Sequence, residues 1–101
     1  MSTLRDKAEA MEKVGAVQRA DQALGTLITM QLQKYEQHLL AVRQELAPFE
    51  ERFSLPSEEG HRRYMAGELG DDAELMEWMG LYDDALLYQE RINTLKAAVE
   101  A

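Results

Sequence analysis

The chain has no cysteine, only two histidines and two prolines, and six glycines in 101 residues. Without cysteine there is no disulfide framework, no thiolate metal site and no cysteine nucleophile. Two histidines cannot supply a zinc site with three histidine ligands. So few prolines and glycines leave little of the turn chemistry that a many-stranded β protein needs. Because Ala, Leu, Glu, Gln and Met are abundant and are good helix formers, the composition predicts an all-α fold.

Long apolar runs are also missing. The most apolar stretch, ALGTLITMQL, is far too short to cross a bilayer, and the N-terminal MSTLRDKAEAMEK lacks the apolar core of a signal peptide. The hydrophobic content of 46% is ordinary for a folded domain. We therefore predict a cytoplasmic protein with a single helical domain over residues 1–101, in which residues 1–20 are a candidate N-terminal arm.

Positive charge is scarce in the second half of the chain. The net charge is −8 overall, and residues 54–101, with four basic and eleven acidic groups, carry −7. Such an acidic half repels phosphate groups, so we expect neither nucleic acid nor a membrane as its direct ligand. It favours encounter with a basic protein surface. The plainer alternative is that the acidic side chains only keep a helical surface soluble.

Four helices are predicted from caps and spacing. Thr3 and Asp6 form a capping box for a helix over 3–19. Asp21 is a candidate N-cap for a long helix over about 22–53, bent near Pro48. A short helix over 57–66 follows Pro56 and ends at Gly67. Asp71 with Glu74 is the predicted capping box of the last helix, over 72–99. The whole is expected to form a helical hairpin or coiled-coil-like bundle.

The long helix carries an a/d heptad seam, which must pack against another helix of this chain or of a second copy. We predict a homodimer or higher oligomer and name as its seam Ile28, Leu32, Tyr35, Leu39, Val42 and Leu46; the same spacing continues through Phe49 and Phe53.

Enzyme and metal-site patterns are weak. The acids around Asp71 and Asp72 lack the alternating order of a calcium loop, and they read better as a cap and a solvated face. No serine lies in a Gly-x-Ser-x-Gly elbow, and Gly67-x-x-Gly70 is followed by acids that would repel a phosphate. We predict no catalytic residue, no metal and no cofactor; binding of an ion or small molecule is the weaker alternative.

A wide face near the only tryptophan is the candidate partner-binding surface. Trp78 and Tyr82 lie one turn apart, with methionines nearby. Core packing is the default interpretation, but a neighbouring apolar row already supplies a seam, and aromatic and Met residues are typical interface anchors. The predicted partner-binding residues are Trp78, Tyr82, Met79, Leu75, Asp83 and Asp84.

A family-like signature runs over about residues 35–95. The residues GELGDD at 67–72, followed by Glu77-Trp78 and Leu81-Tyr82, resemble a group of small helical prokaryotic proteins, some of them presumed antitoxin components of toxin–antitoxin pairs. Gly60 departs from that pattern, which has a large apolar residue there, so the docking of the short helix is in doubt. The resemblance implies a non-enzymatic protein that neutralises a basic toxin; the alternative is a scaffold oligomer or a small subunit of a larger complex.

Overall fold

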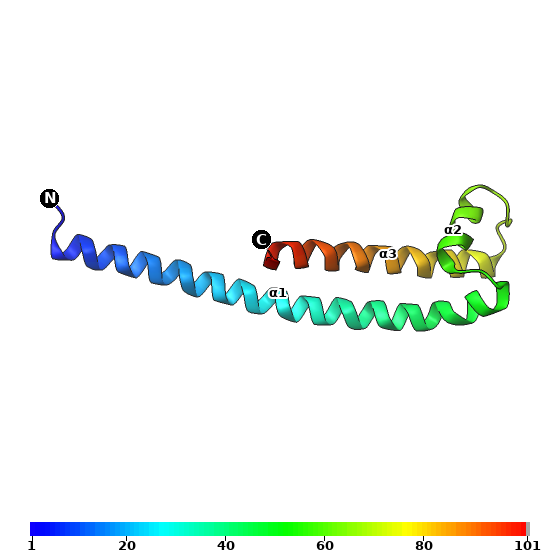
Figure 1. Ribbon diagram of the computed structural model, residues 1–101, viewed down its shortest axis with the longest axis horizontal. Coiled ribbons are helices and arrows are strands. Elements are labelled where there is room, and N and C mark those ends of the chain that lie inside the picture. The colour runs from blue at the N-terminus through cyan, green and yellow to red at the C-terminus, as the bar shows by residue number, and fades with distance from the viewer. Residues whose placement is uncertain (101) are drawn as a thin grey trace. The chain divides into compact units, whose positions relative to one another are not determined.

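The computed structural model describes residues 1–100 and is all-helical over them, with 87% helix and no strands (Figure 1). Its three helices are α1 (Leu4–Phe53), α2 (Ser57–Met65) and α3 (Ala73–Glu100). The chain divides into two units, Met1–Gln31 and Leu32–Ala101. The predicted all-α hairpin is confirmed.

The first unit is a single stretch of α1, and the prediction of separate helices over 3–19 and 22–53 is wrong. No residue between them stops the helix: Gly15 is not in the left-handed region, and no proline lies near it. Asp21 is therefore an ordinary helical residue and not a cap. The Thr3–Asp6 capping box is confirmed, because the Thr3 amide donates to Asp6 Oδ2 and the Asp6 amide donates to Thr3 Oγ1, both at 3.1 Å.

In the second unit the rest of α1 runs antiparallel to α3. Contacts pair low numbers on α1 with high numbers on α3: Glu36 with Lys96 at 3.8 Å, Tyr35 with Tyr88 at a ring distance of 6.0 Å, Arg43 with Gln89 at 3.3 Å, and Arg52 with Glu74 at 2.6 Å. The helix continues through Pro48 to Phe53, and its axis curves over this part (Figure 1). Proline removes one ladder hydrogen bond without ending the helix here.

A tight corner joins α1 to α2. Ser54 has a φ of +53°, the left-handed conformation that commonly ends a helix. The Leu55 amide donates to the Glu50 carbonyl across it at 3.2 Å. The Glu50 side chain then reaches forward, and its Oε2 accepts from the Ser57 amide at 2.8 Å. A carboxylate of α1 thus caps the N-terminus of α2, where negative charge is favourable.

The corner between α2 and α3 was predicted correctly at its start and one residue off at its end. Gly67 has a φ of +76° and donates to the Tyr64 carbonyl, while the Glu68 amide donates to the Arg63 carbonyl at 2.9 Å, a Schellman motif. The cap of α3 is Asp72, not Asp71: its Oδ1 accepts from the Leu75 amide at 3.0 Å. Glu74 bonds Arg52 instead of closing a capping box.

Candidate partner-binding groove

Three of the predicted partner-binding residues lie in the core. Trp78 is 0% exposed, and Leu75 and Met79 are each 4% exposed. The indole of Trp78 stacks on Phe53 at a ring distance of 5.0 Å and on Phe49 at 6.4 Å. Since a partner cannot reach these side chains in the folded chain, their assignment as surface anchors is corrected here to core packing.

Gly60 explains how α2 lies so close to the tryptophan. A Cβ atom built on Gly60 would sit 2.3 Å from Trp78 Cη2, so only glycine permits this approach. The Nε1–H of Trp78 donates to the buried Ser57 Oγ at 2.9 Å, which satisfies the indole's only donor. The packing of α2 against Trp78 therefore depends on Gly60, the residue at which the sequence departs from the family-like pattern.

The predicted oligomer seam is used largely within the chain. Leu39 and Leu46 are buried, and Leu32, Tyr35 and Val42 pack against the same core. The α3 helix covers this part of α1, which leaves little of the seam for a second copy. Of the six seam residues only Ile28 lies outside that core.

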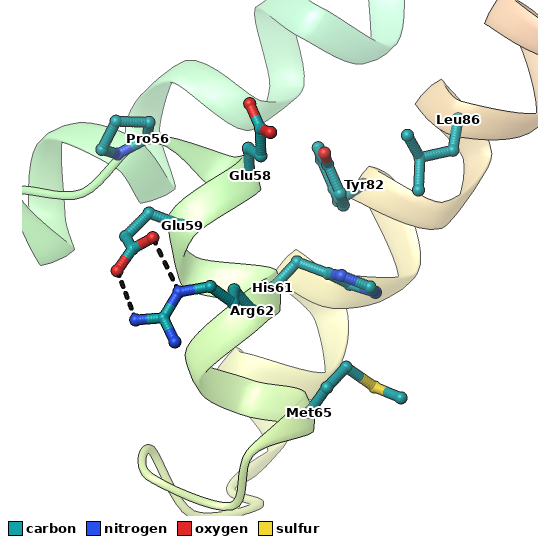
Figure 2. Close-up of a pocket in the computed structure, with 8 residues that line it drawn as sticks. All are labelled: Pro56, Glu58, Glu59, His61, Arg62, Met65, Tyr82 and Leu86. Atoms are coloured by element: carbon teal, nitrogen blue, oxygen red, sulfur yellow. Dashed lines mark hydrogen bonds and ion pairs between the residues drawn. The ribbon is translucent and has the colours of Figure 1, made fainter.

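Of the other predicted partner residues, Tyr82 lines a hollow between α2 and α3 and is half-buried. Asp83 and Asp84 are exposed, and Asp83 contacts His61 of that hollow. The hollow has a volume of about 580 Å³. Figure 2 shows that Tyr82 and Leu86 of α3 face it from one side. Its remaining lining residues are Pro56, Glu58, Glu59, His61, Arg62 and Met65.

Two large apolar side chains that line this groove are accessible. Met65 is 71% exposed and Leu86 is 46% exposed, and both line the hollow together with the half-buried rings of His61 and Tyr82. His61 and Tyr82 lie with ring centroids 5.1 Å apart. An exposed Met and Leu next to aromatic rings are the composition of interface cores.

The rim of the groove is acidic. His61 Nε2 lies 3.3 Å from Asp83 Oδ1, and Glu58 lines the same hollow. Burial, and then the nearby charges of Glu58 and Asp83, raise the pKa of the Tyr82 phenol. At neutral pH the phenol therefore stays protonated and is able to donate a hydrogen bond.

A second charged cluster stiffens α2. Glu59 accepts from Arg62 Nη2 at 2.7 Å and from Arg63 Nε at 3.1 Å. These hydrogen bonds, Arg62 first and then Arg63, lower the pKa of the Glu59 carboxyl to about 2. One carboxylate between two guanidinium groups leaves this cluster with a net charge of +1. The acids that face the groove without an arginine partner are Glu58 in its lining and Asp83 beside His61.

Glu58, His61, Met65 and Leu86 line the groove but are not among the partner-binding residues predicted from the sequence. Glu58, His61 and Met65 are spaced by three and four residues, which is a helical face, and that signal was present in the sequence. What the spacing does not tell is where α2 docks along α3, because that position depends on the Gly60–Trp78 contact.

The described part of the chain contains one partial pattern of a metal site. Glu58 and His61 have the Glu-x-x-His spacing of half a carboxylate di-iron site, yet within residues 1–100 no three His, Cys, Asp or Glu side chains lie close enough to hold an ion. None of the helices described is both long and apolar enough to span a bilayer.

Fold and groove together define a small all-α hairpin whose short middle helix forms one wall of an apolar, acid-rimmed groove. Comparison of the chain with protein-family models, with curated proteins and with solved structures found no match.

Proposed function

We propose that this protein is a non-enzymatic helical protein that binds a basic segment of another protein in the α2–α3 groove. The observation that carries the proposal is the combination of exposed Met65 and Leu86 with two acids, Glu58 in the lining of the same hollow and Asp83 in contact with its His61. An apolar floor supplies contact area, and acidic rims favour encounter with a basic partner.

The size and sides of the groove suit a helix or short strand of the partner. Its walls are two helical faces, with Glu58, His61 and Met65 on α2 and Tyr82 and Leu86 on α3. A partner segment with an apolar side chain between Met65 and Leu86 and an Arg or Lys toward Glu58 and Asp83 would match both features. The protonated Tyr82 phenol adds a hydrogen-bond donor at the centre of the site.

An antitoxin-like role is one form of this proposal. In that form the partner is a basic toxin, and the net charge of −7 on residues 54–101 supports association with it. The alternative of a scaffold built on the Ile28–Leu46 seam has less support, because α3 packs on most of that seam.

Two neighbouring leucines provide a matched test. Leu86 lines the groove and is 46% exposed, while Leu87 is 43% exposed and lines a different hollow, with Tyr35. We expect Leu86→Arg to weaken binding of the basic partner at least about tenfold, through lost apolar contact and like-charge repulsion, whereas Leu87→Arg changes it little.

The measurement is isothermal titration calorimetry with the purified product of the adjacent gene, at low and at high salt. Binding should weaken as salt rises, because rim charges are screened. Equal loss in both variants would place the binding surface elsewhere, and no heat or complex with the wild-type chain would remove this partner from the proposal.

A further inference from the structure

The first part of α1 carries an apolar stripe that nothing in its own unit covers. Val14, Val17 and Leu24 are exposed at 54%, 69% and 60%. Together with the exposed Asp21 and the half-buried Ile28 they are spaced by three, four, three and four residues, which is a coiled-coil heptad. This spacing suits a second helix lying along the stripe.

Local interactions give residues 14–31 limited helix stability. The stretch VGAVQRADQALGTLITMQ has ten good helix formers (Ala, Leu, Met, Gln and Arg), but two glycines, two valines, an isoleucine and two threonines offset them. The one ion pair recorded for this unit, Arg5 with Glu9 at 3.8 Å, lies before it. Because isolated helices are marginal in water, a partner helix is the available source of stability.

The charges of this stretch indicate what that partner is. Arg19 and Asp21 are its only charged residues, so it is neutral while the chain as a whole carries −8. A basic protein, a nucleic acid or an anionic membrane would find no matching charge here. A second copy brings an equally neutral stripe of the same length and heptad spacing, without the repulsion that two acidic surfaces would meet elsewhere on the chain.

We propose that two copies of this protein pair through residues 10–28 of α1 in an antiparallel, two-fold arrangement. Parallel pairing would set the Asp21 carboxylates opposite each other in an apolar seam, which is unfavourable. Antiparallel pairing sets Val14 beside Leu24 of the second copy, Val17 beside Asp21 of the second copy, and Ala10 beside Ile28 of the second copy. The contact is ~28 Å long and each copy contributes the same surface, as two-fold symmetry requires.

This inference goes beyond the proposed partner-binding function, which concerns α2 and α3. The dimer carries two grooves, so a partner with two binding segments would bind the dimer more tightly than it binds a single chain. Failure of either proposal leaves the other standing, because the dimer is measured without any partner present.

Sedimentation equilibrium of the full chain tests the dimer. The wild-type chain should be dimeric at about 100 µM, and Leu24→Asp should raise the dissociation constant at least about a hundredfold, since the stripe position is lost in both copies. Gln22→Asp is the matched control: it adds the same charge two residues away on the opposite face, and it should leave the constant within about threefold of wild type.

Each other outcome of that experiment counts against the proposal. A monomeric wild-type chain at this concentration overturns it, as does an unchanged Leu24→Asp or an equal effect of Gln22→Asp. Emission of the buried Trp78 should be the same in all three proteins, and this checks that the second unit remains folded.

Disulfide cross-linking tests the direction of pairing. Because the chain has no native cysteine, only the introduced cysteines form disulfides. Val14→Cys and Leu24→Cys chains are prepared separately and oxidised alone or as a mixture. Antiparallel pairing predicts rapid cross-linking of the mixture and little of either chain alone. Rapid cross-linking of Val14→Cys alone would show a parallel dimer and refute the arrangement.

Discussion

Two parts of α1 differ in the burial of their apolar side chains. From residue 32 onward the apolar positions of α1 are covered by α3, and Leu39 and Leu46 are buried. Before residue 32 positions with similar periodicity, such as Val17 and Leu24, are exposed. The spacing of hydrophobic residues therefore shows which face of a helix is apolar. Whether that face is buried depends on whether another segment of the chain packs against it.

The largest expected difference between the two parts concerns leucine. Leu46→Ala removes a buried side chain and should lower the free energy of unfolding by about 2–5 kcal/mol. Leu24→Ala, at a concentration where the chain is monomeric, should change it by less than about 0.5 kcal/mol. Urea unfolding followed by Trp78 fluorescence measures both. Similar losses would mean that the first part of α1 is also packed against the core.

A Gly-to-Ala substitution should change the free energy of unfolding with opposite sign at Gly60 of α2 in the second unit and at Gly25 of α1 in the first unit. Gly60→Ala forces a Cβ to within 2.3 Å of the Trp78 ring, so we expect a loss of about 1–3 kcal/mol from overpacking, even though alanine is the better helix former. Gly25→Ala meets no atom within 4 Å and should stabilise the helix by up to about 1 kcal/mol.

Urea unfolding with Trp78 emission measures the Gly60 variant, and far-UV circular dichroism measures helix content for the Gly25 variant. A Gly60→Ala chain as stable as wild type would contradict the close packing of α2 on the indole.

The smallest expected effect is the loss of stability at low pH that comes from the Glu59 carboxylate. The pKa of Glu59 is lowered from 4.5 to about 2 by hydrogen bonds from Arg62 and then Arg63. The charged carboxylate is thus favoured by folding, and its contribution is complete above about pH 4.5 and is lost as the pH falls toward 2. No comparable cluster of one carboxylate with two arginines is recorded for Met1–Gln31.

Carbon-detected NMR titration of the Glu59 carboxyl measures this pKa. Replacing both arginines with glutamine should return the value toward 4.5, and an unchanged low value in that variant would assign the shift to another cause.

Local signals in the sequence predicted the elements well. Thr3 with Asp6, Pro56 and Gly67 mark helix ends because their chemistry acts within a few residues. Asp72 was missed by one position, since Asp71 and Asp72 are chemically equivalent as caps and the corner geometry selects between them. The helix break predicted near Asp21 was wrong. An aspartate that is able to cap a helix does not by itself end the helix that precedes it.

The groove was predicted only in part. Tyr82 was identified, and so was Asp83, which contacts His61 of the groove. Trp78 was named as a partner-binding residue, but the default interpretation of core packing is the correct one, because Trp78 is fully buried. A side chain's neighbours come from residues distant in sequence, here Phe49, Phe53 and Gly60, and spacing on one helix carries no information about them.

By itself the sequence determined that this protein is helical, where most of its helices start and stop, and that its second half is acidic, because these properties follow from local propensity and composition. Only the tertiary structure decided which apolar faces are covered. Gly60 lets α2 lie against Trp78, which buries the tryptophan and forms a groove beside Tyr82. The apolar side chains of the first unit, such as Leu24, remain exposed. The reason is physical: burial depends on contacts between distant segments, and a single missing Cβ was enough to permit the decisive one.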